Sequence, residues 1–414
     1  MDIMMDTLLL VESNSTGTGP LFARRARELG AEPVLMAAEP DRYAYARQDG
    51  IRVLEVDTTD LAAMLRVAGS LRGRPCGVTS SSEYYIPVAA ELARRLGRPG
   101  PDPVAVARCR NKATQRADLA AGGVPVPGYA AAQTVAAAVA GADRIGYPVV
   151  VKPADGSGSV GVLHCADRVQ VADHAARLLA TTTNERDLPV ARQVLVEWYA
   201  DGPEFSVEVF GDAVIAVVAK HLGPAPHFVE TGHDMPAELP AEQDAVLRHV
   251  ALRAVAALRL GFGAAHVEIR LTTAGSVLIE VNPRLAGGMI PELIRSAVGI
   301  DLVTAQVAAA MGRAVPLGFA HAAHASLRFL TADGPAVLGD GQAALADACR
   351  LPGIVEARLY RGHGERLGRA RDFRDRIGHV RSAAPTGAAS RAAADAALDR
   401  LRAALQPLRE GVPR

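Results

Sequence analysis

The sequence predicts an α/β protein that begins with a doubly wound parallel sheet. Short apolar segments alternate with helical segments of about ten residues over positions 1–103, a pattern typical of a parallel sheet covered by helices. Apolar residues make up 49% of the 414 residues and charged residues 22%, which is enough to bury a large core. At roughly 100–200 residues per domain, the length predicts several domains.

Composition also limits the classes of partner. Lys and Arg total 45, as do Asp and Glu, so the formal net charge is zero and nucleic acid is not an expected partner. No apolar run reaches the roughly 18–20 residues that a membrane-spanning helix needs, so no membrane partner is expected. The cysteines are far apart and form no CxxC pair, which favours reduced thiols and a cytoplasmic location. They are Cys76, Cys109, Cys165 and Cys349.

The N-terminal elements follow in order. We expect helices over residues 21–29 and 60–71. The expected strands cover residues 7–11, 33–37, 52–56 and 77–79. The turn Gly17-Thr18-Gly19 after the first strand is reminiscent of a dinucleotide site, but the third glycine of that motif is missing and Pro20 opens the helix, so this indication is weak.

A stretch rich in Pro and Gly, residues 97–103, ends the first domain. A helix is expected over residues 104–121 and a strand over 148–152. The last residues carry one strand-like piece, 326–330, and an amphipathic helix, 391–405. The expected domains are residues 1–103, residues 104–317 with a glycine-loop subdomain at about 125–200, and a C-terminal α+β subdomain of residues 318–414.

A glycine-rich loop follows the apolar strand that ends in Lys152. Small residues let the backbone close over an anion so that its N–H groups face phosphate oxygens, and Lys152 adds positive charge. The lysine precedes the glycines, so this is not a Walker loop. An ordinary glycine-rich hairpin is the alternative to a phosphate-binding loop. The loop contains Gly156, Ser157, Gly158, Ser159 and Gly161.

Two alternating strands between Ala265 and Asn282 predict a hairpin with Gly275 in its turn. A three-residue turn would place Glu268 directly opposite Glu280, with Asn282 on the same face. Two facing carboxylates and an amide oxygen are hard ligands suited to Mg²⁺, and Mn²⁺ is possible. A solvated acidic pair is the alternative.

Lysine is rare in this chain. It occurs only at Lys112, Lys152 and Lys220, against 42 arginines. A lysine retained in such a background can mark a place that needs a compact ammonium group, although chance survival on the surface is the alternative.

Together these motifs resemble the ATP-grasp superfamily of carboxylate–amine ligases over residues 5–315. The branch of L-amino-acid (dipeptide-forming) ligases is the most similar, and biotin carboxylase is more distant. The resemblance depends on Val151-Lys152-Pro153 with the glycine loop and on Glu280-Val281-Asn282-Pro283-Arg284, and residues 284–288 fit the amino-acid-ligase branch. It implies two α+β subdomains that clasp ATP, followed by a small C-terminal subdomain.

The resemblance implies a role for each matched position. Lys112 and Lys152 would contact ATP phosphates under the glycine loop, and Glu204 would lie near the ribose. Glu268, Glu280 and Asn282 would hold Mg²⁺. Arg284 would face the acyl phosphate and the tetrahedral intermediate. The hinge over adenine would consist of Glu197, Trp198, Tyr199 and Ala200.

Substrate contacts are expected in three places. Glu230 would hold an α-ammonium group and His233 would approach the intermediate, with a solvated or structural histidine as the alternative. Glu83 and Tyr84 follow the fourth strand at the sheet edge where such folds bind ligands. The N–H groups of Gly287 and Gly288 would join Arg284 in stabilising an oxyanion, and their small size would leave room beside it.

These observations predict a ligase that uses ATP and Mg²⁺ to join a small carboxylate to an amine through an acyl phosphate. Carboxylation through carboxyphosphate and ATP binding without turnover are the alternatives. We expect a homodimer and a natural-product pathway. The segment 372–380 is expected to be part of a structural cap.

Overall fold

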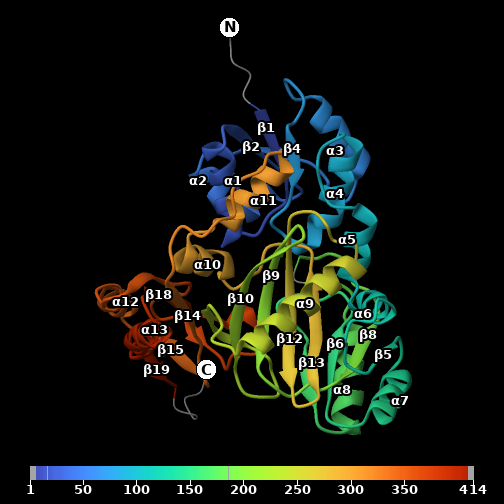
Figure 1. The fold of residues 1–414 in the computed structure, drawn as a ribbon, viewed down its shortest axis with the longest axis vertical. Helices are drawn as coiled ribbons and strands as arrows, with labels where there is room; N and C mark the ends of the chain where they lie inside the picture. Colours follow the sequence, from blue (N-terminus) through green and yellow to red (C-terminus); the bar gives the residue numbers. More distant parts are fainter. Residues whose placement is uncertain (1–5, 16, 185, 409–414) are drawn as a thin grey trace.

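The computed structural model describes residues 6–15, 17–184 and 186–408. Its N-terminal part is a parallel four-stranded sheet in the order β3-β2-β1-β4. The four strands match the predicted ones, and the fold class is the one predicted (Figure 1). They are β1 (Asp6–Val11), β2 (Ala31–Ala37), β3 (Arg52–Glu55) and β4 (Gly77–Thr79).

Both faces of this sheet are covered, as its unbroken apolar strands require. Leu8 and Leu10 of β1 pack on one side with α1 (Thr18–Glu28) and α11 (Leu302–Ala310). Leu9 and Val11 pack on the other with α3 (Leu61–Gly69) and α4 (Ile86–Arg95). The N-terminal unit is therefore completed by α11, which comes from the far end of the predicted central domain (Figure 1).

The single helix predicted over residues 104–121 is wrong. Two helices stand there, α5 (Pro103–Arg110) and α6 (Lys112–Ala121). Asn111 between them is extended, and its side chain accepts hydrogen bonds from the N–H groups of Ala113 and Thr114. This capping starts a new helix at Lys112 and places that lysine at the helix N-terminus.

The glycine-loop subdomain is an antiparallel sheet in the order β5-β8-β6-β7, covered by α7 and α8. The glycine-rich loop connects β6 to β7. The elements are β5 (Tyr129–Ala132), α7 (Val135–Ile145), β6 (Val149–Pro153), β7 (Leu163–Cys165), α8 (Arg168–Ala180) and β8 (Val194–Trp198).

An eight-stranded antiparallel sheet, β13-β12-β9-β10-β11-β14-β18-β16, joins the central and C-terminal parts. The predicted boundary at residue 317 separates two parts of the chain, but strands from both parts belong to this one sheet. β14 confirms the predicted C-terminal strand. The strands are β9 (Glu204–Phe210), β10 (Ala213–Leu222), β11 (Glu230–Met235), β12 (Ala264–Thr272), β13 (Gly275–Asn282), β14 (His324–Leu330), β16 (Ile354–Leu359) and β18 (Gly378–Ala384).

Helices pack on this sheet, and a small sheet of three strands, β17-β15-β19, completes the C-terminal part (Figure 1). The sequence pattern missed these short strands. The remaining elements are α2 (Ala44–Gln48), α9 (Ala241–Ala257), α10 (Ile290–Val298), β15 (Ala336–Leu338), α12 (Gly341–Cys349), β17 (Arg366–Leu367), α13 (Gly387–Arg402) and β19 (Leu405–Pro407).

The β12–β13 hairpin corrects one prediction and confirms another. Thr272 pairs with Gly275, so the turn contains two residues and the predicted three-residue turn is wrong. The register then shifts on β13 at Ile279, and beyond this bulge Glu268 pairs with Glu280 as predicted. The bulge restores the register that a longer turn would have given.

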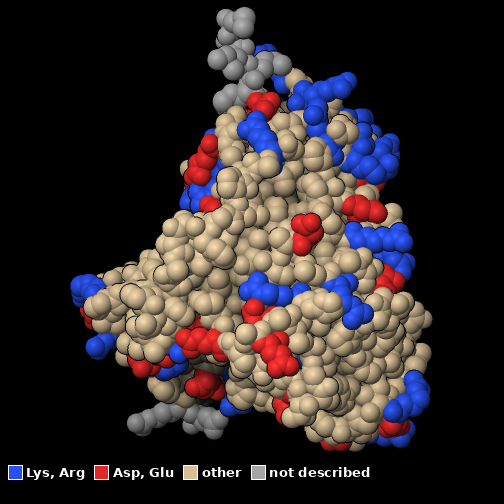
Figure 2. Space-filling model, in the orientation of Figure 1, with Lys and Arg blue, Asp and Glu red and all other residues tan. Residues whose placement is uncertain are grey.

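Among the described residues, no single helix has the length and hydropathy to cross a membrane; α10 and α11 reach them only as a pair bent by 113°. On the face drawn in Figure 2, both signs of charge are interspersed among large uncharged areas. This mixture agrees with the zero net charge of the sequence.

Candidate active site

Lys220 on β10 lies at the centre of the site. Its Nζ atom is 2.8 Å from Glu204, 3.0 Å from Glu230 and 2.7 Å from Glu268, and the residue is 9% exposed. The three acids come from β9, β11 and β12, which lie near β10 in the sheet. Burial alone would lower the pKa of Lys220, but the three carboxylates raise it well above its ordinary value. The scarcity of lysine was the one sequence signal for this residue.

Glu268 and Glu280 are each held by a lysine. Lys220 binds Glu268, and Nζ of Lys112 lies 3.0 Å from Glu280. Burial would raise the pKa of Glu268, but Lys220 and His266 bring it well below its usual range. Both facing carboxylates therefore have cationic partners, and Glu268 is ionised.

These acids suit a divalent ion that brings ligands of its own. No group of three or more His, Cys, Asp or Glu residues within the described ranges has the arrangement of a complete protein cage. Mg²⁺ commonly keeps several waters and uses one or two carboxylates together with substrate phosphates. Asn282, which is 6% exposed, lies two residues after Glu280 on the same strand and is expected on the same face.

His266 contacts one of the two facing acids, and the sequence reasoning missed it. One ring nitrogen lies 2.6 Å from Glu208 and the other 3.2 Å from Glu268. Burial would lower its pKa, but the two carboxylates raise it to about 10. His266 is therefore a cation at neutral pH. A histidine between apolar strand residues carries no sequence signal of this role.

Lys152 pairs with Glu197 at 2.5 Å. Burial lowers the pKa of this lysine, although the charge of Glu197 acts to raise it. Glu197 also accepts a hydrogen bond of 2.7 Å from Arg116, which is 2% exposed. The same guanidinium donates to the carbonyls of Leu278 and Ile279 at the β13 bulge. Arg116, which the sequence reasoning also missed, thus links Lys152 to the strand that carries Glu280.

The glycine-rich loop is held from two sides. Nζ of Lys112 donates a hydrogen bond to the carbonyl of Gly156, and Oγ of Ser157 donates to Glu83 at 2.7 Å. Ser159 and Gly161 have φ values of 63° and 72°, the left-handed region that tight loops use. Gly158 lies against Phe373 from the C-terminal part.

The predicted hinge begins in the last two residues of β8, and Arg270 contacts the two hinge residues that follow the strand. This arginine is 6% exposed, pairs with Glu204 at 2.8 Å and donates to the carbonyl of Ala200 at 2.9 Å. Its guanidinium also lies 5.4 Å from the centre of the Tyr199 ring. Trp198 is 38% exposed. Hinge and ribose residues are therefore joined through Arg270, which had no sequence signal in an arginine-rich chain.

Arg284 reaches the N-terminal domain. Its Nε atom donates to Glu83 at 3.0 Å, and Arg110 pairs with the same carboxylate. Burial would raise the pKa of Glu83, but the two arginines bring it well below its usual range. Tyr84 lies under Arg110, 4.9 Å from ring centre to guanidinium.

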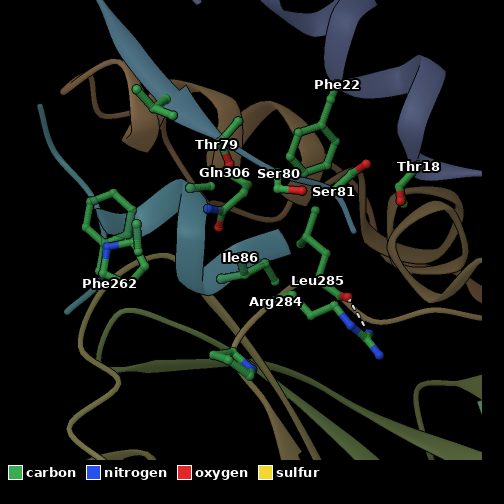
Figure 3. Close-up of a pocket in the computed structure, with 15 residues that line it drawn as sticks. Thr18, Phe22, Thr79, Ser80, Ser81, Ile86, Phe262, Arg284, Leu285 and Gln306 are labelled. Atoms are coloured by element: carbon green, nitrogen blue, oxygen red, sulfur yellow. Dashed lines mark hydrogen bonds between the residues drawn. The ribbon is translucent and has the colours of Figure 1, made fainter. Parts of the chain in front are cut away.

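A pocket opens beside Arg284, between the N-terminal sheet and the end of β13 (Figure 3). Phe22 and Phe262 lie on opposite sides of it, and hydroxyl groups of Thr79, Ser80 and Ser81 come from the end of β4. The pocket combines apolar walls with a few polar groups, as small-molecule sites commonly do.

Glu230, which pairs with Lys220, lies together with His233 and Gly288. His233 is fully buried, neither ring nitrogen has a hydrogen-bond partner among the described residues, and Nε2 lies 3.9 Å from Glu230. Burial lowers the pKa of His233 to about 3, so its imidazole is neutral at physiological pH. A Cβ atom on Gly288 would lie 2.8 Å from Nε2, whereas Gly287 has open space around it.

The chain matches two protein families. Residues 145–292 match the ATP-grasp domain, and residues 328–406 match the L-amino acid ligase C-terminal domain 2. The uncharacterised protein y4rH of Sinorhizobium fredii (strain NBRC 101917 / NGR234) is 39% identical over 404 residues, which span 96% of this chain and 82% of that protein.

One further sequence match and one structural neighbour are more distant. Carnosine synthase 1 of Mus musculus is 30% identical over 334 residues; the match spans 75% of this chain but only 40% of that protein. The crystal structure of L-amino acid ligase from Bacillus licheniformis superposes with a TM-score of 0.79 over 98% of this chain and 99% of that one, at 20% identity.

The fold and the matched domains indicate the same family. The chain belongs to the ATP-grasp superfamily of carboxylate–amine ligases and carries the C-terminal domain of the L-amino acid ligase branch.

Proposed function

We propose that this protein activates the carboxylate of an α-amino acid as an acyl phosphate and joins it to an amine. The observation that carries the proposal is the position of Arg284. It is held by Glu83 at the mouth of a pocket, and the charges of Glu280 and Glu268 act on it directly. An arginine beside a paired-acid site is placed to contact an acyl phosphate formed there.

The first step makes the acyl phosphate. A carboxylate oxygen attacks the γ-phosphorus of ATP, and the bond to the β-phosphate oxygen breaks to release ADP. Lys112 and Lys152 would neutralise the phosphates. Glu268, Glu280 and Asn282 would hold Mg²⁺, which when bound neutralises charge on the β- and γ-phosphate oxygens.

The second step makes the amide. The amine nitrogen attacks the acyl carbon, the carbon–oxygen bond to phosphate breaks, and the nitrogen loses a proton. Arg284 and the N–H groups of Gly287 and Gly288 would stabilise the oxyanion of the tetrahedral intermediate. The neutral imidazole of His233 can accept a hydrogen bond at this point, because its nitrogens have no other partner among the described residues.

Two features support an amino acid as the activated acid. Glu230 presents an ionised carboxylate near His233, suited to an α-ammonium group. Gly288 lies directly against His233 and Glu230, where an added Cβ would lie 2.8 Å from Nε2, so this glycine helps to shape the same site.

Carboxylation is a second candidate. The α subunit of a methylcrotonoyl-CoA carboxylase from Glycine max is 32% identical over 321 residues, 72% of this chain and 42% of that protein. Such a reaction would activate bicarbonate in place of an amino acid, at the same nucleotide and metal groups.

A matrix of amino acids and amines tests the proposal, scored by phosphate release and product mass. We expect ADP and phosphate release that requires both an amino acid and an amine, with a product lighter by one water than the two reactants together. Phosphate release that requires bicarbonate and no amino acid would favour carboxylation. Nucleotide binding without release under any condition would refute both.

A further inference from the structure

A short segment of the C-terminal part crosses the active site. Residues 372–376 lie between β17 and β18 and form a tight turn. The Asp372 side chain accepts a hydrogen bond from the N–H of Arg374, and the Asp375 side chain accepts from the N–H groups of Arg371 and Asp372. This reciprocal capping makes the segment a rigid unit.

Arg376, at the end of this segment, reaches the predicted substrate acid. One of its Nη atoms lies 2.5 Å from the Glu230 carboxylate. Its guanidinium is 3.7 Å from the centre of the Phe329 ring, and its Nε atom is buried without a hydrogen-bond partner in the described part of the chain. Phe329 thus supports the arginine from one face and directs it toward β11.

The charges around Lys220 explain why Glu230 needs Arg376 as a second cationic partner. One ammonium group contacts three carboxylates, and each of these has a second cation of its own. Arg270 pairs with Glu204, His266 pairs with Glu268, and Arg376 pairs with Glu230. Without Arg376, Glu230 would depend on Lys220 alone and would compete for it with Glu268.

Phe373, three residues earlier, lies against the nucleotide side of the site. A Cβ atom on Gly158 would overlap its ring, so the aromatic face rests directly on the glycine-rich loop. The ring is 40% exposed and packs into no core cluster of the described residues. The ring therefore contacts the loop that is predicted to cover the phosphates.

We propose that residues 372–376 form an active-site strap, in which Arg376 positions Glu230 for the substrate and Phe373 seats the glycine-rich loop over the nucleotide. The part concerning Glu230 rests on the proposed function; the part concerning Phe373 needs only nucleotide binding. Because the capped turn is rigid, the strap couples the two sites. The C-terminal part thereby completes the active site instead of only capping the fold.

The first test measures steady-state kinetics of Arg376→Met and Arg376→Lys. We expect the KM for the amino acid to rise about tenfold in Arg376→Met, as the loss of a charged hydrogen bond predicts, while the KM for ATP changes less than twofold. Arg376→Lys, which keeps the charge, should fall between this variant and the wild type. Arg371→Met removes an exposed arginine of the same loop and serves as the matched control.

An unchanged KM for the amino acid in Arg376→Met would overturn the positioning role. Equal changes in both KM values, shared by the Arg371→Met control, would also overturn it, because they would reflect loss of structure only. Circular dichroism melting curves establish that each variant is folded before its kinetics are compared.

The second test needs no acid substrate. Calorimetry with a non-hydrolysable ATP analogue and Mg²⁺ should give an affinity about fivefold weaker in Phe373→Ala, and an unchanged affinity in Phe319→Ala, which removes an aromatic ring that is 69% exposed. Phe373→Leu, which keeps an apolar contact, should lie between them. Equal affinity in Phe373→Ala and the wild type would overturn the seating role. If the wild type forms no amide with any substrate, the proposed function fails while this result still decides the seating role.

Discussion

Arg284 and Glu83 are paired across 201 positions of sequence, with Nε of the arginine 3.0 Å from the carboxylate. The pair joins the loop after β13 to the end of β4 in the N-terminal domain. It orients two donor groups of Arg284 toward Glu83, and a third donates to the carbonyl of Leu285. The planar guanidinium is therefore held in one orientation before any ligand binds.

Replacing Arg284 by alanine should depress turnover far more than nucleotide binding. Loss of one donor to a developing oxyanion typically costs about 10²–10³ in rate. A coupled ADP assay should show this loss, while calorimetry should give an ATP affinity within about threefold of the wild type. Arg295→Ala, which removes a half-exposed arginine paired with Glu292, is the control. Full activity in Arg284→Ala would contradict the role given to this residue.

Replacing Lys220 by methionine should destabilise the fold. The variant leaves three carboxylates together around an uncharged side chain, and breaking a buried ion pair typically costs about 3–5 kcal/mol. Urea unfolding followed by circular dichroism measures the loss. A destabilisation below about 1 kcal/mol would show that Lys220 is not the group that holds these acids together.

Gly288 and Gly287 form a matched pair for testing the substrate side. A Cβ on Gly288 would press on His233 and Glu230, and its φ of 58° disfavours other residues, whereas Gly287 has open space around it. We expect Gly288→Ala to raise the KM for the amino acid about tenfold and Gly287→Ala to leave it nearly unchanged. Similar kinetics in the two variants would place the substrate elsewhere.

His233 should make stability depend on pH. Its pKa is lowered by burial from 6.5 to about 3, so between these values the unfolded chain binds a proton that the native chain does not. Stability is therefore fully present above pH 6.5 and falls as the pH drops toward 3. At pH 5 the loss attributable to this group is about 2 kcal/mol.

Urea midpoints at pH 7.5 and pH 5 measure this effect. The wild type should lose more stability over this interval than His233→Asn, in which the titrating group is gone. Parallel losses in the two proteins would mean that His233 is protonated in the folded state at pH 5.

The sequence predicted most of the fold and the acids of the site. Periodicity located the N-terminal strands, and the hairpin pattern brought Glu268 opposite Glu280. The predicted pairing of these two acids was right although the predicted turn was wrong. The real turn is one residue shorter, and the bulge at Ile279 restores the register. The sequence did not reveal this bulge, because no glycine or proline stands there. Short strands of the C-terminal part were missed because two or three residues show no measurable alternation.

The cations that hold the site together were the main omission. Arg116 and Arg270 are buried and Arg376 is partly buried, and all three pair with acids of the candidate site. Arginine is so frequent in this chain that its presence carries little information. Lysine behaved differently. All three lysines contact acids of the site, so rarity was a usable signal even for Lys220, which matched no motif.

Transfer of oxygen from the amino acid to phosphate tests the central claim most directly. When the substrate carboxylate is labelled with ¹⁸O, acyl phosphate formation leaves one labelled oxygen in the bridge to phosphorus, and attack by the amine releases it with the phosphate. Mass spectrometry of the phosphate should therefore find one ¹⁸O atom per turnover. Phosphate without the label, formed while the amide accumulates, would contradict activation of the carboxylate by ATP.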